Sequence, residues 1–141
     1  VVAAILRAGL PLHQGVLNVF DDAENAFVSA YRNYNDDYNF DIHIEYIASP
    51  SLDDKVLVLC DPMLATGGSM ELAYEALLSK GTPDKLHVVS VIASRQAIEY
   101  LEDKLPNDAT VWVGAIDEFL NQHKYIVPGL GDAGDLAFGE K

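Results

Sequence analysis

Short apolar runs alternate with polar segments along the whole chain. Several runs of strand length, rich in β-branched residues, are followed by apolar positions three and four apart, which is the helical period. These patterns predict strands at 1–6, 26–31, 40–47, 56–60, 86–93 and 110–115, and helices at 11–20, 70–80 and 95–105. Pro11 suits a first helical turn and Ser94 suits an N-cap, so both mark expected helix starts.

The order of these elements predicts an α/β fold. Strands joined through helices run parallel with right-handed crossovers, which predicts a doubly wound, mainly parallel sheet with helices on both faces. The run at 56–60 has no polar break, so we expect this strand to be buried on both faces. A length of 141 residues suits a single domain, residues 1–141, with one hydrophobic core.

Three segments depart from the regular alternation. Residues 32–39 are polar and turn-rich, which predicts a protruding β-hairpin at about 31–47 with a flexible tip. Residues 116–120 are expected to form a short helical turn. Residues 125–135 hold three glycines, a proline and two aspartates, so no regular helix or strand is expected there. The apolar residues expected to anchor this last segment to the core are Tyr125, Ile126, Val127 and Leu130.

Charge and composition narrow the range of partners. The net charge is −13, from 9 basic and 22 acidic residues, which disfavours nucleic acid and anionic membranes. Hydrophobic residues make up 50% of the chain, which argues against disorder, and no apolar run reaches the length of a membrane helix. Cys60 is the only cysteine and is expected to be a packing residue, as is Trp112. A cytoplasmic protein is the plain expectation.

The segment 61–69 has the features of an anion site. It begins with Asp61 at the end of a predicted strand and closes with Thr66-Gly67-Gly68-Ser69 at the start of a predicted helix. A helix start has unpaired N–H groups and the positive end of the dipole, which suits phosphate. The two glycines let an anion approach the backbone, and the hydroxyls of Thr66 and Ser69 add donors.

The same segment limits which anion fits. It has no Gly-Lys-Ser/Thr triplet and no lysine, so it is not a Walker A loop. Asp61 would repel a phosphate, so it is expected to face sugar hydroxyls or a magnesium ion. A ligand with a phosphate at one end, ribose hydroxyls in the middle and a metal-bound diphosphate beyond them matches this arrangement. That ligand is 5-phosphoribosyl 1-diphosphate.

Residues 60–69, Cys-Asp-Pro-Met-Leu-Ala-Thr-Gly-Gly-Ser, resemble the phosphoribosyl-diphosphate motif of type I phosphoribosyltransferases, in the form found in uracil phosphoribosyltransferases. Two further stretches agree: 5–10, Ile-Leu-Arg-Ala-Gly-Leu, and 125–135, Tyr-Ile-Val-Pro-Gly-Leu-Gly-Asp-Ala-Gly-Asp. The resemblance runs over nearly all 141 residues in order and implies the type I phosphoribosyltransferase fold. Because the chain starts within a strand and without methionine, it is expected to be the C-terminal two-thirds of a subunit.

The resemblance also implies roles for individual residues. The turn after Arg7 binds diphosphate and has a cis peptide beside that arginine, while a mobile hairpin brings Arg32 to the diphosphate. The implied catalytic residues are Asp61, Arg7 and Arg32. The implied contacts to phosphoribosyl diphosphate are Arg7, Arg32, Asp61, Pro62, Met63, Leu64, Ala65, Thr66, Gly67, Gly68, Ser69 and Asp132. The implied uracil contacts are Ile126, Gly131, Asp132 and Ala133, mainly through backbone groups.

The reaction implied by the resemblance is attack of uracil N1 on ribose C1′, which releases diphosphate and forms UMP. No paired nucleophile and base is evident, and the four histidines lack metal-ligand spacing. Catalysis would therefore come from positioning and from neutralising the leaving diphosphate, with Mg²⁺ bound mainly through the substrate. Backbone groups that match uracil's carbonyls and N3–H would leave cytosine mispaired.

Other interpretations remain open. Arg7 could simply be a surface arginine at a strand end, the hairpin could be an ordinary exposed one, and 125–135 could be a disordered tail. A sister enzyme could use a purine or orotate. From another class, the chain could be a non-catalytic regulator that senses phosphoribosyl diphosphate. An RNA-binding regulator is one form of this alternative, although the acidity of the chain counts against RNA. The family resemblance also implies a homo-oligomer.

Overall fold

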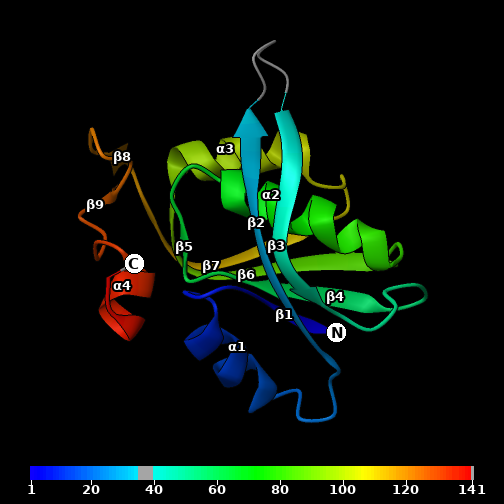
Figure 1. Cartoon of the computed structure of the whole chain (residues 1–141). Helices are drawn as coiled ribbons and strands as arrows, with labels where there is room; N and C mark the ends of the chain where they lie inside the picture. Colours follow the sequence, from blue (N-terminus) through cyan, green and yellow to red (C-terminus); the bar gives the residue numbers. More distant parts are fainter. Residues whose placement is uncertain (35–39, 141) are drawn as a thin grey trace.

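The fold is built around a seven-stranded sheet in the order β3-β2-β1-β4-β6-β5, with β7 paired to β6 (Figure 1). The structure is a computed structural model that describes residues 1–34 and 40–140, with the side chains of residues 30–42 left out of the description. The strands are β1 Val2–Ile5, β2 Asn25–Tyr34, β3 Phe40–Ala48, β4 Val56–Cys60, β5 Met63–Leu64, β6 Lys85–Ser94 and β7 Thr110–Asp117.

The sheet is mainly parallel, as the sequence predicts. Strand β1 pairs in parallel with β2 and β4, β6 pairs in parallel with β4, β5 and β7, and β3 is antiparallel to β2 in the predicted hairpin. Two helices lie on one face of the sheet and α1 lies on the other (Figure 1). The helices are α1 Leu10–Leu17, α2 Gly68–Leu77 with a 3-10 turn at Leu78–Lys80, α3 Arg95–Lys104 and α4 Ala133–Phe138.

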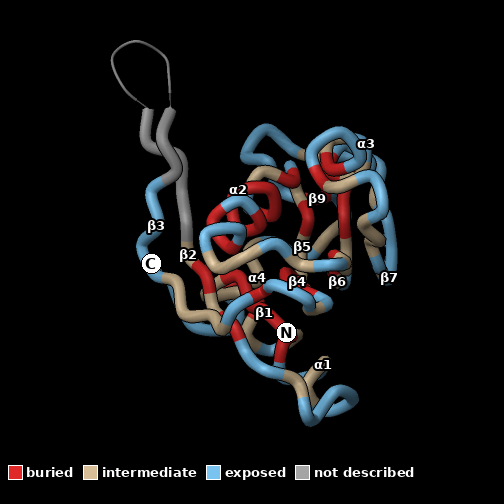
Figure 2. Tube along the Cα trace, turned by 90° about the vertical axis from the view of Figure 1, so that its right-hand side faces the viewer, coloured by how far each residue is buried: buried red, intermediate tan, exposed pale blue. Residues whose placement is uncertain are grey.

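The core lies between the sheet and the pair α2 and α3. Inward residues of β4 and β6 such as Leu57, Leu59 and Val88 are fully buried against Leu77 and Leu101 from the helices. Figure 2 shows the buried positions gathered in α2 and the central strands. The predicted N-cap is confirmed, because the Ser94 side chain accepts a hydrogen bond from the backbone N–H of Ala97. No helix in the described ranges combines the length and apolar character needed to cross a bilayer.

The opposite face of the sheet is only partly covered. Helix α1 buries Val2 and Ala4 of β1, but Val56 of β4 is 46% exposed, so the prediction that 56–60 is buried on both faces is wrong at its first residue. Trp112 of β7, expected to pack, is 58% exposed, and its indole N–H donates to Nδ1 of His87 at 3.2 Å. The physical reason is that α1 packs mainly on β1 and β4, and no comparable packing of α1 on β6 or β7 is found in the described part of the chain.

The segment after β7 differs most from the sequence prediction. Instead of a helical turn at 116–120, β7 continues to Asp117 and a short strand β8, Phe119–Leu120, pairs antiparallel with β9, Ile126–Val127. The stretch 125–135, expected to lack regular structure, thus forms β9 and the start of α4. Only Ile126, 3% exposed, is anchored in the core, whereas Tyr125, Val127 and Leu130 are each more than 40% exposed. Two-residue strands are too short to show a period in sequence.

Candidate active site

The candidate site lies at the carboxyl ends of β1 and β4. These strands are parallel neighbours, with Ala4 opposite Cys60, so Arg7 and Asp61 follow them at the same edge of the sheet. A cavity of about 210 Å³ is lined by Arg7, Asp61, Ser69 and Asp132 among others. The three sequence stretches that were predicted to act together therefore meet around one cavity.

A smaller cavity of about 70 Å³ continues from this one along the predicted phosphate loop. It shares Asp61 and Ser69 with the larger cavity and extends to Thr66 and Gly67. Gly67 is the N-cap of α2 with φ of +84° and has no side chain to cap the helix. At this helix start, the Thr66 hydroxyl accepts a long hydrogen bond of 3.5 Å from the N–H of Gly68. A Cβ at Gly67 would lie 2.9 Å from the Tyr100 ring, so this position needs glycine for both conformation and space. The N–H groups that begin α2 thus border a pocket, as a phosphate site requires.

A buried side-chain network supports this loop from behind. Glu71, in the first turn of α2, is 6% exposed and accepts a hydrogen bond of 2.5 Å from the Tyr100 hydroxyl of α3. The ammonium of Lys104 lies 3.7 Å from the same carboxylate. The network joins α3 to the first turn of α2. Sequence reasoning missed it, because nothing local to Glu71 indicates a partner 29 residues away.

Asp61 has an unusual electrostatic environment. Its side chain is almost completely buried, and burial raises its pKa to about 7, with a further increase from the charge of Asp132. The N–H of Met63 donates to it at 3.4 Å and lowers the pKa in part. Burial also raises the pKa of the adjacent Cys60 thiol to about 12, so Cys60 is a neutral packing residue, as predicted. The site therefore contains a carboxylate that is desolvated before any ligand arrives.

This pKa predicts a pH-dependent stability difference between the wild type and Asp61→Asn. An unfolded aspartate has a pKa near its model value of 3.8, so between pH 4 and 7 the folded state binds more protons at this site than the unfolded state. The contribution of the Asp61 carboxyl to the unfolding free energy is therefore greatest below pH 4 and is lost as the pH rises through 7. Melting temperatures measured from pH 4 to 8 should show Asp61→Asn gaining relative to the wild type as pH rises. A constant difference would contradict the raised pKa.

Arg7 is held on the other side of the cavity. The Leu6–Arg7 peptide bond is cis, which confirms the sequence prediction. One guanidinium nitrogen, Nη2, donates to the carbonyl oxygen of Gly139 at 2.9 Å and to Oδ1 of Asp135 at 3.4 Å. Arg7 is thus joined to the C-terminal helix and lines the cavity, so it is not a simple surface arginine at a strand end.

The predicted base segment borders the same cavity through two residues, Asp132 and Gly134. Asp132 lines the cavity and is the N-cap of α4. Its Oδ1 accepts a hydrogen bond of 2.9 Å from the backbone N–H of Asp135. The other predicted uracil contacts are close to Asp132 in sequence but are not among the residues that line the cavity: Ile126, Gly131 and Ala133. The Val127–Pro128 peptide bond is cis. The presence of a proline was the only feature of the sequence that could have indicated this bond.

Arg32, the remaining predicted site residue, lies on β2 opposite Ile42 of β3. Its side chain lies outside the described part of the structure, so the predicted contact with diphosphate is a proposal. The same holds for the expected tip of the hairpin at 35–39. His43, predicted to face solvent, is exposed.

The acidic groups of the site include candidate ligands for a metal ion. Within the described residues, no three His, Cys, Asp or Glu side chains are grouped so as to hold a metal ion. Asp61 and Asp132 do line the same cavity and supply two carboxylates. Mg²⁺ in proteins is commonly bound through one or two carboxylates, with substrate phosphates and water completing its shell. These two carboxylates therefore match the protein ligands that Mg²⁺ takes when phosphate oxygens complete its shell.

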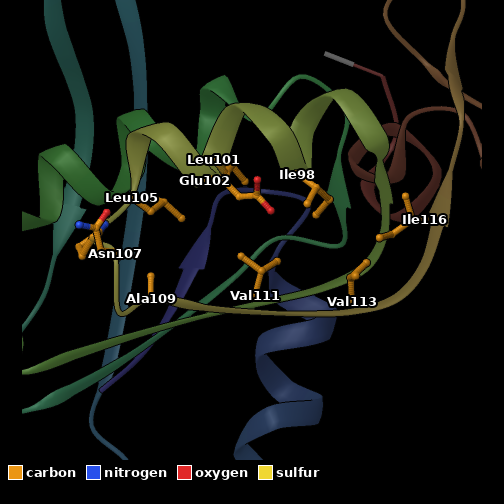
Figure 3. Close-up of a pocket in the computed structure, with 10 residues that line it drawn as sticks. Ile98, Leu101, Glu102, Leu105, Asn107, Ala109, Val111, Val113 and Ile116 are labelled. Atoms are coloured by element: carbon orange, nitrogen blue, oxygen red, sulfur yellow. The ribbon is translucent and has the colours of Figure 1, made fainter.

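A larger cavity of about 380 Å³ lies between α3 and β7. Figure 3 shows the side chains of Ile98, Leu101 and Leu105 from α3 directed toward those of Val111 and Val113 on β7. Its lining is largely aliphatic, and Glu102 is its one ionisable side chain. The polar edge at the ends of β1 and β4 is therefore the better candidate for chemistry.

Comparison with known proteins agrees with this geometry. The family model described as uracil phosphoribosyltransferase matches residues 1–140. A uracil phosphoribosyltransferase from Porphyromonas gingivalis is 65% identical over 141 residues, which are 100% of this chain and 65% of that protein. One from Methanothermobacter thermautotrophicus is 45% identical over 139 residues, 99% of this chain and 62% of that protein. The chain thus spans slightly less than two-thirds of the length of these curated relatives.

Solved structures agree as well. The AQ2163 protein from Aquifex aeolicus has a TM-score of 0.83 and 39% identity, over 98% of this chain and 64% of that one. A purine phosphoribosyltransferase from Pyrococcus horikoshii has a TM-score of 0.59 at 15% identity, over 84% of this chain and 78% of that one. The second likeness concerns the fold alone.

Proposed function

The chain belongs to the uracil phosphoribosyltransferase family, and on that premise we propose that it transfers the phosphoribosyl group of 5-phosphoribosyl 1-diphosphate to N1 of uracil, forming UMP and diphosphate. The observation that carries the proposal is the single cavity lined by Arg7, Asp61, Ser69 and Asp132. These residues come from three separate stretches of the sequence. Each stretch would bind a different part of the two substrates: the phosphate and ribose, the diphosphate, or the base.

The phosphate and ribose ends of the substrate would occupy the region around Asp61. The N–H groups at the start of α2, with the hydroxyls of Thr66 and Ser69, would hold the 5′-phosphate. Asp61 would accept hydrogen bonds from the two ribose hydroxyls, as an ionised carboxylate can. Support comes from the position of Asp61, which lines both the small cavity at the loop and the larger one beside Arg7.

The diphosphate would lie at the opposite end, against Arg7 and the hairpin residue Arg32. These cations would stabilise charge as the bond from C1′ to diphosphate breaks. Magnesium, when bound with the substrate, neutralises part of the diphosphate charge, and Asp132 is the residue proposed to lie beside it. The net charge of −13 makes these few cations necessary, and it supports a partner set without nucleic acid or membrane.

Uracil would be recognised by the segment 126–133. The family match supports backbone contacts from Ile126, Gly131 and Ala133, which would pair with the base's carbonyls and N3–H. Such a site rejects cytosine, because an amino group would meet backbone N–H donors. No side chain is required as a base, since the reaction would depend on placing N1 close to C1′. We also propose a cytoplasmic homo-oligomer, in line with the family resemblance.

A direct assay tests the reaction. The chain is incubated with labelled uracil, 5-phosphoribosyl 1-diphosphate and Mg²⁺, and UMP is separated and counted beside the Porphyromonas gingivalis relative. We expect UMP with uracil, loss of product when EDTA removes the metal, and at least about 100-fold less transfer to cytosine, which would leave buried groups unpaired.

Two outcomes would contradict the proposal. Calorimetric binding of 5-phosphoribosyl 1-diphosphate with no UMP formed would favour the non-catalytic regulator. Faster transfer to hypoxanthine or orotate than to uracil would favour a sister enzyme that uses another base.

A further inference from the structure

The C-terminal helix α4 contacts the cationic side of the cavity. Oδ1 of Asp135 and the carbonyl oxygen of Gly139 both accept from Nη2 of Arg7, at 3.4 and 2.9 Å. The two acceptors come from the first turn of α4 and from the residue after its end. From the sequence alone, Asp135 could be only a solvated carboxylate or a helix cap, so it is not among the predicted site residues.

Helix α4 is itself fixed at the cavity. Asp132, which lines the cavity, accepts the Asp135 N–H at 2.9 Å and so caps the helix that carries Asp135. Gly134 is buried, and a Cβ there would lie 3.2 Å from Oδ1 of Asp132 and 3.7 Å from Cβ of Ala8. The first turn of α4 thus packs on the residue next to Arg7. Asp135 therefore has a defined position relative to the guanidinium.

The guanidinium also has an unused donor. Nε of Arg7 is buried and has no hydrogen-bond partner within the described part of the chain. Arginine presents its N–H donors in one rigid plane, so fastening Nη2 also restricts the direction of the remaining donors. Arg7 lines the cavity and its side chain is 37% exposed, so the accessible part of the guanidinium is what an anionic oxygen in the cavity would meet. The buried Nε would need a small shift of the side chain to donate to that oxygen.

We infer that Asp135 is a positioning residue, which together with the Gly139 carbonyl holds the Arg7 guanidinium so that its remaining donors face the diphosphate of the substrate. The identity of that anion rests on the proposed function. A plain surface ion pair would behave differently, because partly exposed pairs contribute little and their loss leaves ligand binding unchanged. The Arg7 and Asp135 side chains are 37% and 34% exposed, so only a ligand-dependent measurement separates the two cases.

Binding of 5-phosphoribosyl 1-diphosphate with Mg²⁺ tests the inference by titration calorimetry. We expect Asp135→Ala to raise its Kd about tenfold, the effect of one misplaced charge-assisted contact. Asp135→Asn keeps a side-chain acceptor, so its Kd should rise by less than that of Asp135→Ala. Glu140→Ala is the matched control, since it removes the same charge from an exposed residue of the same segment and should leave Kd within about twofold. Thermal melts of each variant show whether it is folded.

A double-mutant cycle with Arg7 shows whether Asp135 affects Kd by positioning the guanidinium or only through its negative charge. In an Arg7→Ala background, Asp135→Ala should have no further effect on Kd, because the group that it positions is absent. An unchanged Kd in Asp135→Ala, or an equal loss in the Arg7→Ala background, would overturn the inference. If the wild type forms no UMP while its affinity still depends on Asp135 through Arg7, the inference stands and the proposed reaction fails.

Discussion

Replacing Asp61 by alanine is expected to lower kcat/KM for 5-phosphoribosyl 1-diphosphate by about 100-fold or more, because hydrogen bonds from hydroxyls to a charged group contribute about 1.5–3 kcal/mol each. The proposed role of Asp61 is supported by its place after the end of β4, where it lines both cavities of the site. It is buried, so no neighbouring water would replace the lost carboxylate at low cost. The fold should remain, since removing this carboxylate also removes a buried charge.

The measurement is the initial rate of UMP formation at varied phosphoribosyl diphosphate and saturating uracil. Circular dichroism and thermal melting establish that Asp61→Ala is folded. Asp84→Ala provides the control, because Asp84 is an exposed aspartate just before β6, at the opposite end of the parallel strands. Its rate should stay within about twofold of the wild type, as for most surface substitutions. Wild-type activity in Asp61→Ala would remove Asp61 from the site.

Gly9→Ala is expected to have the largest effect on stability. A Cβ at Gly9 would lie 2.6 Å from the carbonyl oxygen of Cys60, 2.7 Å from that of Ile5 and 2.9 Å from the nitrogen of Ile5. All three atoms are backbone, so relief requires moving the turn at Gly9 away from the ends of β1 and β4. The φ of Gly9 is −69°, so the clash is one of space and not of conformation. We expect the unfolding free energy to fall by about 3 kcal/mol, at the upper end of overpacking costs.

Urea unfolding followed by tryptophan fluorescence measures this loss. Gly15→Ala is the matched control, because Gly15 lies inside α1 and a Cβ there would meet nothing within 4 Å. That substitution should stabilise the protein by about 0.5–1 kcal/mol through helix propensity. Equal stability of Gly9→Ala and the wild type would show that the two strand ends are not in the close contact described here. The activity of Gly9→Ala should also fall, since the turn that holds Arg7 would move relative to Asp61.

Elements with strong local signals were predicted closely. The apolar run of β4, the helical spacing of α2 and α3 and the Ser94 cap are properties of a few consecutive residues, and each matches the structure within a few positions. The alternation of strands and helices was sufficient to predict a mainly parallel sheet. From that topology alone, Arg7 and Asp61 fall at one edge.

The errors concern features that depend on distant partners. Strands β8 and β9 exist only through their mutual pairing, and the exposure of Trp112 follows from where α1 lies. The bonds of Asp135 to Arg7 and of Tyr100 to Glu71 join residues from opposite ends of the chain or from different helices. No local pattern distinguishes these side chains from solvated ones.

The order of residues along the chain determined the sheet, its carboxyl edge and the phosphate loop, because hydrophobic period, glycine placement and helix starts act over neighbouring positions. Tertiary packing decided the rest. It set the desolvation that raises the pKa of Asp61 to about 7, the close backbone packing around Gly9 and the hydrogen bond from Arg7 to the carbonyl oxygen of Gly139. Burial and contact distance depend on which surfaces meet, and that is a property of the assembled fold.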